Sequence, residues 1–192
     1  MNDVARPSRL ADAGGLILPY KNKWPAIGKD VFIAPNATVI GDVTIGERSS
    51  VWFNTLIRGD DHWIRIGSRT NIQDGAIVHI SKGTSPTTIG SDITIGHGAI
   101  IHGCVLEDRC LVGIGAIVLD GAVVETGSVV AAGAVVAPGK RVKSGEVWAG
   151  CPAKLIRAMR PEDLKYIDED AVLYCELASD YLKMRRAAVK GL

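Results

Sequence analysis

The sequence predicts an all-β protein with a C-terminal α-helix, in which the strands wind into a parallel β-helix. Three observations support this: a six-residue repeat, a high glycine count beside few aromatic residues, and a change of pattern near residue 160. Glycine numbers 22 in the 192 residues, whereas aromatic residues make up only 5%. That mixture suits a repeat in which one narrow turn recurs along the chain.

The repeat is clearest from residue 93 onward. There the chain divides into eight successive hexads, most with an aliphatic residue in the first two places: ITIGHG, AIIHGC, VLEDRC, LVGIGA, IVLDGA, VVETGS, VVAAGA and VVAPGK. Ile-Gly pairs extend the pattern so that it covers about residues 31 to 150. A period of six fits neither an α-helix nor a coiled coil, so both are excluded across this span.

Short strands joined by tight corners do fit this period. Val and Ile favour strands, while Gly, Asn and Asp tolerate the positive φ that corners require. Three hexads, roughly eighteen residues, then form one coil, and the aliphatic residue of each hexad points into the lumen. With insertions at 60–65 and 80–88, the inward residues are expected to include Ile57, Ile66, Ile72, Val78, Ile89, Ile95 and Ile101.

The pattern changes after the coils. Pro161, followed by Glu162 and Asp163, is typical of a helix start. Apolar residues then recur at three-to-four spacing, which predicts an amphipathic helix with this stripe: Leu173, Leu177, Tyr181 and Met184. The flank of the β-helix, on its own or a neighbouring subunit, is the apolar surface against which such a helix would pack.

We therefore divide the chain into a β-helix domain, residues 1–157 with a lead-in at 1–30, and a C-terminal helical segment, 158–192. Lys and Arg total 22 against 21 for Asp and Glu, a net charge of +1. A chain with so little net charge has no overall electrostatic attraction to nucleic acid or to an anionic membrane. The N-terminus has no apolar signal region, and Asp120 and Glu125 interrupt the longest aliphatic tract. A soluble, cytoplasmic protein is expected, with four cysteines that are small buried thiols.

Two of the four histidines, His97 and His102, lie five residues apart in a stretch that otherwise resembles monotonous β-structure. In the placement above, Arg58, His79 and His102 each directly follow an inward residue of one face, so they stack on successive coils. His97 lies on another face, just above Asp74. Stacked imidazoles about 5 Å apart, the spacing of neighbouring strands, can bind a metal from one side.

His97, on another face, could hardly complete that site within the same subunit, but a neighbouring subunit could supply it. Three neutral imidazoles with an open fourth position suit Zn2+, which lowers the pKa of its bound water to about 7 and creates hydroxide at neutral pH. Fe2+ or Co2+ would accept the same ligands. A lone histidine in a β-rich region is more often a satisfied core or surface residue, and His62 keeps that interpretation.

Five stretches that span most of the chain carry a family resemblance: SSVWFNTLIRGD (49–60), IRIGSRTNIQDGAIVH (64–79), TIGHGAIIHGC (94–104), LVGIGAIVLDGAVV (111–124) and AGCPAK (149–154). Together they resemble the gamma-class carbonic anhydrases of the hexapeptide-repeat superfamily. The hexads and the final pattern are shared with acyltransferases of that superfamily, whereas the Arg-Gly-Asp, Gln-Asp-Gly and three-histidine set is much more specific. The resemblance implies left-handed β-helices that assemble as a homotrimer.

The resemblance also implies the metal ligands and the reaction. His79 and His102 of one subunit and His97 of the next would bind the metal at each subunit interface. The implied reaction is the reversible hydration of CO2 to bicarbonate.

Five further residues have a role by this resemblance. Arg58 and Asp60 match a structural ion pair near the subunit interface. Gln73 orients the metal-bound hydroxide, and Asp74 supports the interface and the metal ligands. Tyr174 resembles a tyrosine that some relatives place near the metal, although at helical spacing such a residue more often serves packing.

One departure concerns the loop after His79. Fast family members carry a long acidic loop there with a proton-shuttling glutamate, whereas residues 80–88, ISKGTSPTT, are short and contain no carboxylate. Asp61 matches another acidic position near the site. Slow CO2 hydration is therefore expected. Two alternatives stay open: a CoA-dependent acyltransferase or thioesterase, with its pantetheine arm bound between coils, and a trimeric scaffold with a structural metal.

Overall fold

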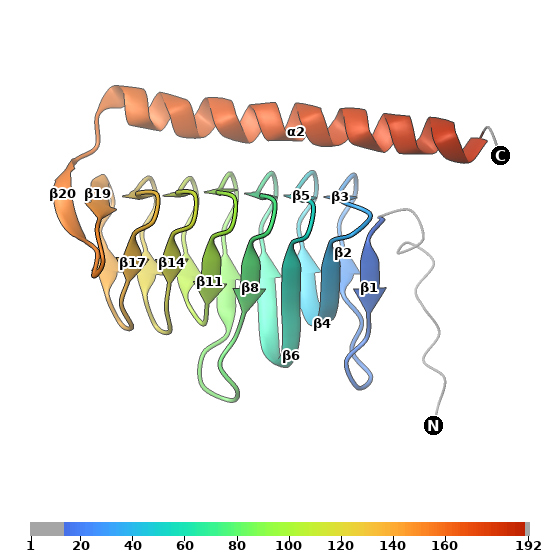
Figure 1. The fold of residues 1–192 in the computed structure, drawn as a ribbon, viewed down its shortest axis with the longest axis horizontal. Coiled ribbons are helices and arrows are strands. Elements are labelled where there is room, and N and C mark those ends of the chain that lie inside the picture. The colour runs from blue at the N-terminus through green and yellow to red at the C-terminus, as the bar shows by residue number, and fades with distance from the viewer. Residues whose placement is uncertain (1–13, 191–192) are drawn as a thin grey trace.

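A computed structural model describes residues 14–190, with side chains to 187, and confirms a parallel β-helix with one long C-terminal helix (Figure 1). One face is a stack of short parallel strands that β20 extends in the antiparallel direction. Its strands are β3 (Phe32–Ile33), β5 (Ser50–Val51), β7 (Asn71–Ile72), β10 (Thr94–Ile95), β13 (Leu111–Val112), β16 (Val129–Val130), β19 (Glu146–Ala149) and β20 (Lys154–Ala158). We call it the helix-covered face.

The other two faces share one 12-stranded sheet, because β4 (Thr38–Ile45) and β6 (Leu56–Ile66) each run through the corner between them. One of these faces is completed by β1 (Leu16–Leu18), β8 (Ile77–His79), β11 (Ile100–His102), β14 (Ile117–Val118) and β17 (Val135–Val136). The other is completed by β2 (Ala26–Ile27), β9 (Thr87–Ile89), β12 (Val105–Leu106), β15 (Val123–Val124) and β18 (Arg141–Val142).

The lumen is filled as the sequence predicts. All seven expected inward residues are at most 4% exposed. Ile72 pairs with Ile95 and Val78 with Ile101, so equivalent faces of successive coils lie in register. The six-residue period is broken once. Ile101 pairs with Val118, which lies seventeen rather than eighteen residues later, so one corner of this coil is one residue shorter than the others.

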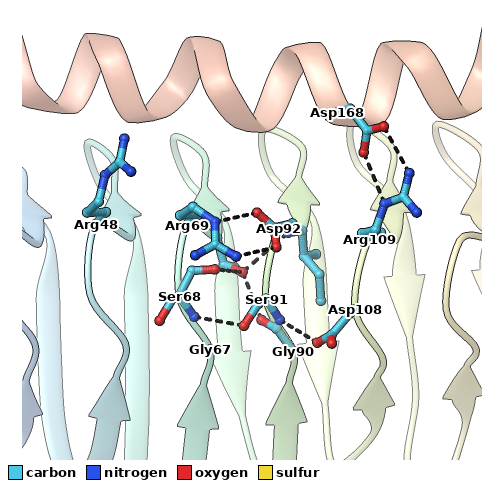
Figure 2. A network of polar contacts seen from close by, with 12 residues as sticks. Arg48, Gly67, Ser68, Arg69, Gly90, Ser91, Asp92, Asp108, Arg109 and Asp168 are labelled. Carbon is cyan, nitrogen blue, oxygen red and sulfur yellow. Dashed lines mark hydrogen bonds and ion pairs between the residues drawn. The ribbon is translucent and has the colours of Figure 1, made fainter.

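A column of charged residues forms the corner beneath the C-terminal helix (Figure 2). Arg48, Arg69, Asp92 and Arg109 have φ values of 53–58°, the left-handed region that side chains other than glycine rarely adopt. Arg69 makes two 2.6 Å hydrogen bonds to Asp92, and Arg109 makes two of 2.9 and 3.0 Å to Asp168 of the helix. Because the Arg109–Asp168 pair is solvent-exposed and the Arg69–Asp92 pair is only partly buried, these pairs fix geometry more than they add stability.

The helix α2 (Pro161–Lys190) begins where the sequence predicts and runs back along the helix-covered face from the last coil to the first (Figure 1). The stripe that it buries differs from the predicted one. The buried residues are Ile167, Ala171, Ala178 and Leu182, whereas the predicted Leu173, Leu177 and Met184 are exposed.

The physical reason is side-chain size. Ala171 and Ala178 are almost fully buried, and their small side chains let the helix backbone lie close to the strands. Tyr181 of the predicted stripe is exposed too, but one side of its ring packs inward, 5.2 Å from the ring of Phe32 and 5.4 Å from that of Trp52.

The cysteines match their prediction only in part. Cys104 and Cys110 are buried, and burial raises their thiol pKa values to about 12 and about 11. Cys151, in the turn between β19 and β20, is exposed, and Cys175 on α2 is half-buried. Within residues 14–190, no helix is long and apolar enough to cross a membrane.

The start of α2 is closed by a reciprocal cap, which predicts an acid-dependent stability. Asp163 accepts hydrogen bonds from the Arg157 side chain (2.6 Å) and from the Arg160 backbone N–H (2.7 Å), and its own N–H donates to the Arg160 carbonyl. The Arg157 hydrogen bond, followed by that of Arg160, lowers the pKa of Asp163 to about 2.

An aspartate in an unfolded chain has a pKa of about 3.9, so the stabilisation from Asp163 is complete above that pH and is lost as the pH falls toward 2. Between pH 5 and pH 2, the unfolding free energy of Asp163→Asn should therefore decrease less than that of the wild type. Denaturant titrations across this range measure it, with the neighbouring Glu162→Gln as control. If the unfolding free energy of the Asp163 variant falls as steeply between pH 5 and pH 2 as that of the wild type, the assignment is wrong.

Candidate metal centre

His79 and His102 form a pair at the ends of β8 and β11, in register as the sequence placed them. Their ring centroids are 5.1 Å apart, and Nδ1 of His79 lies 3.2 Å from Nε2 of His102. Two nitrogens that bind one tetrahedral zinc at about 2.0–2.1 Å are separated by about 3.3 Å. The two facing nitrogens therefore have the spacing of one edge of a zinc site.

The second nitrogen of His79 is held by an aspartate. Nε2 of His79 lies 3.3 Å from Oδ1 of Asp60, and Asp60 forms an ion pair with Arg58. Burial, followed by the Arg58 charge, lowers the pKa of His79, which favours the neutral imidazole that binds metals. Burial raises the pKa of Asp60, but the Asp61 N–H and Arg58 outweigh it, and the pKa is lowered overall.

The second nitrogen of His102 is held by Asp120, which the sequence analysis did not place at the site. Oδ1 of Asp120 lies 2.5 Å from Nδ1 of His102, and the Ser81 hydroxyl donates to the other carboxylate oxygen. That hydroxyl is the largest cause of the lowered pKa of Asp120. A Cβ at Gly103 would lie 2.6 Å from Oδ1 of Asp120, so glycine makes room for this contact.

The short loop 80–88 supports both histidines. Besides Ser81, it supplies Thr87, whose hydroxyl donates to the His79 carbonyl (2.5 Å) and accepts from the Gly103 N–H (3.0 Å). Loop 80–88, which has no acidic residue, thus holds the backbone in place at His79 and next to His102.

His97 lies on another face and is not brought to the pair. Its Nδ1 is 3.0 Å from Oδ2 of Asp74, and the Gly98 N–H donates to the Asp74 carbonyl over 2.8 Å, so His97 stands above Asp74 as placed from the sequence. The part of the chain that the structure describes contains no group of three or more His, Cys, Asp or Glu residues that could hold a metal ion.

The candidate residues instead form two separate groups. We call the first the paired half-site; it comprises Arg58, Asp60, His79, His102 and Asp120. We call the second the His97 half-site; it comprises Gln73, Asp74, His97 and Tyr174. Eight of these nine residues were predicted from the sequence, and Asp120 is the one that was missed. Its position was accessible, because Asp120 lies one coil above His102 in the corner that follows Val118.

The His97 half-site opens into a cavity of about 350 Å3 between α2 and the coils. Gln73, His97 and Tyr174 line it together with apolar residues such as Ile114 and Val130. The ring of Tyr174 also packs edge-on against Trp52, 5.3 Å between centroids, so it serves packing and faces the cavity at once. Burial raises the pKa of Tyr174, which keeps its phenol protonated at neutral pH.

Comparisons with known proteins agree with the fold and identify the family. Residues 25–59 match a family model described as bacterial transferase hexapeptide (six repeats). The chain is 55% identical to a probable carbonic anhydrase of Methanocaldococcus jannaschii over 79% of its own length and 95% of the relative. It is 49% identical to gamma carbonic anhydrase 2, mitochondrial, of Arabidopsis thaliana over 82% of its length, but spans only 58% of that relative.

A solved structure of a putative acetyltransferase from Bacillus cereus superposes with a TM-score of 0.86 at 40% identity, covering 88% of this chain and 98% of the other. The fold is thus shared with proteins named for two different activities. Both sequence relatives described above, by contrast, are named carbonic anhydrases, and the match to the archaeal one covers 95% of its length. The chain therefore belongs to the gamma-class carbonic anhydrase family of hexapeptide-repeat proteins.

Proposed function

We propose that the chain forms a homotrimer of left-handed β-helices that binds Zn2+ between the paired half-site of one subunit and the His97 half-site of the next, and that the assembly hydrates CO2 reversibly to bicarbonate. One observation supports this most directly. Each of the three histidines has one nitrogen held by its own aspartate, and the other nitrogens of His79 and His102 face each other 3.2 Å apart. That is how metal-binding imidazoles are held in zinc enzymes.

The donor set fits the metal. Three neutral imidazoles with an open fourth position are the ligands of a catalytic zinc, and Fe2+ or Co2+ would accept the same set. Bound zinc supplies the Lewis acidity that makes hydroxide available at neutral pH. The cytoplasmic location and the absence of nucleic-acid and membrane partners stay predictions from composition.

The remaining chemistry falls to the residues of the cavity. Gln73 accepts a hydrogen bond from the attacking hydroxyl and so turns an oxygen lone pair toward the CO2 carbon. The apolar wall that includes Ile114 and Val130 holds CO2 and excludes competing water. The released proton leaves through buffer or the exposed carboxylate of Asp61, and since loop 80–88 has no carboxylate to relay it, turnover is slow.

The test is CO2 hydration followed by stopped flow on zinc-loaded protein. We expect one metal ion per subunit and a measurable but slow rate that exceeds the buffer rate. His79→Ala should lose most of the metal and the rate, whereas His62→Ala, a histidine outside both half-sites, should retain both. A fully metal-loaded protein with only the buffer rate would instead favour a scaffold with a structural metal.

Acyl transfer is the second candidate, because the Bacillus cereus structure carries the name of a putative acetyltransferase. A CoA-dependent transferase or thioesterase on this fold needs one histidine as a base and no metal. It would therefore act on acetyl-CoA after metal removal by a chelator. Retained turnover of acetyl-CoA in metal-free protein would favour this candidate over CO2 hydration.

A further inference from the structure

A chain of polar side chains connects Gln73 to helix α2. Asn71, Gln73 and Thr94 lie under the helix on its covered face and are only 1%, 5% and 3% exposed. The Gln73 Nε2 donates to Asn71 Oδ1 over 3.1 Å, and the Asn71 Nδ2 donates to Thr94 Oγ1 over 2.9 Å. The Thr94 hydroxyl donates to Oδ2 of Asp170 on α2 over 2.7 Å. We call these four residues the Asp170 chain.

The direction of every hydrogen bond in this chain follows from Asp170. An ionised carboxylate only accepts, so the single Thr94 hydroxyl proton must point to Asp170. Thr94 can then only accept from Asn71, which therefore presents its NH2 to Thr94 and its oxygen to Gln73. Gln73 must in turn donate its own NH2, and its Oε1 is left for the cavity.

The free oxygen faces solvent rather than protein. The Gln73 Oε1 has no hydrogen bond within residues 14–187, and no buried side-chain nitrogen or oxygen of the described residues lacks a partner. Gln73 also lines the cavity beside His97. An acceptor aimed at this cavity is what a hydroxyl nucleophile needs, whereas the reversed amide would present a donor.

We propose that Asp170 is a positioning residue that sets the amide of Gln73 with its oxygen toward the cavity. The inference rests on the proposed function for its consequence in catalysis, but the orientation itself exists without metal. Without an acceptor-only group at position 170, Thr94 is free to donate to Asn71. The whole chain then reverses, and Gln73 turns its NH2 into the cavity.

The decisive variant is Asp170→Asn, which keeps the shape of the side chain but can donate a hydrogen bond. In metal-free, 15N-labelled protein, the Gln73 side-chain amide resonances are assigned by their loss in Gln73→Glu. We expect their exchange with water to be slow in the wild type and about tenfold faster in Asp170→Asn, the equivalent of losing one neutral hydrogen bond. If the Gln73 amide protons exchange at the same rate in Asp170→Asn as in the wild type, the proposal is wrong, whether or not the protein hydrates CO2.

Two further variants separate orientation from folding. Thr94→Val removes the hydroxyl at nearly constant shape and should speed up the exchange as Asp170→Asn does, while Thr94→Ser should stay within about twofold of the wild type. Asp168→Asn is the matched control, because Asp168 fastens the same turn of α2 through Arg109 (Figure 2) but lies outside the chain. Faster Gln73 exchange in Asp168→Asn would show that helix docking, not hydrogen-bond direction, is measured, and would also overturn the proposal.

The catalytic consequence is tested by a double-mutant cycle in zinc-loaded protein. Asp170→Asn should lower kcat/KM for CO2 about tenfold in the wild-type background and have no further effect in Gln73→Ala. Additive losses would exclude Asp170 as a positioning residue for Gln73. If the wild type does not hydrate CO2 at all, the proposed function fails, and the exchange measurement still decides the orientation of Gln73.

Discussion

Subunits that carry His97→Ala, and subunits that carry both His79→Ala and His102→Ala, are each expected to bind almost no metal, and a mixture of the two is expected to regain it. The reason is that the paired half-site and His97 lie on different faces of one chain, so each interface would draw them from two subunits. In a mixed trimer, one interface joins an intact pair to an intact His97. Random mixing at equal amounts then restores about a quarter of the wild-type sites.

A matched mixture provides the control. His79→Ala subunits mixed with His102→Ala subunits have no interface with both members of the pair, because the two side chains face each other within one chain at 3.2 Å. We expect no recovery of metal or of CO2 hydration there. Co-assembly is verified by native mass spectrometry with isotope-labelled subunits. If mixed trimers form in the first experiment and bind no metal, the ligands are not shared between subunits.

Gly113→Ala is expected to destabilise the fold by about 3 kcal/mol or more, as a severe case of overpacking. A Cβ at Gly113 would lie 2.4 Å from the backbone nitrogen of Ala132 in the next coil and 2.8 Å from the Ala131 carbonyl carbon. Backbone atoms cannot swing away as a flexible side chain does, so the coils must separate. Denaturant unfolding at one fixed protein and zinc concentration measures the loss, since assembly contributes to stability.

Gly133→Ala is the matched control, with the same chemical change and a different cost. Gly133 has a φ of 67°, and a Cβ there would meet nothing within 4 Å. Its expected cost is the strain of alanine in the left-handed region, about 1–2 kcal/mol. Equal losses in the two variants would show that coil spacing is not limited by backbone contact at Gly113.

The coils were predictable because a six-residue period admits few geometries. Ile72 and Ile95, or Val78 and Ile101, could be paired from the sequence alone once the insertions at 60–65 and 80–88 were recognised. The same placement stacked His79 on His102 and set His97 above Asp74. The repeat period and the spacing of the strands are properties of the backbone, so they can be predicted without knowing any side-chain contact.

The parts that escaped prediction depend on how elements approach one another. Hydrophobicity alone selected Leu173 and Leu177 for the buried side of α2, whereas close approach to a flat face of strands favours Ala171 and Ala178. Asp120 was noticed only as an interruption of an aliphatic tract, although it holds His102. Asp170 gave no signal at all, since an acidic residue in a surface helix is ordinary until its partner Thr94 is known.

The course of α2 along the whole stack has a consequence for how the protein is made. The first coil places Phe32 against Tyr181, so the earliest strands leave the ribosome long before the helix that covers them. At translation rates of about 5–20 residues per second, that wait lasts roughly seven to thirty seconds. During it, the rings of Phe32 and Trp52 lie open to chaperones and to other nascent chains. The last segment to be synthesised thus closes the first, and a ribosome that stalls within α2 would display a nearly complete β-helix with its apolar flank uncovered.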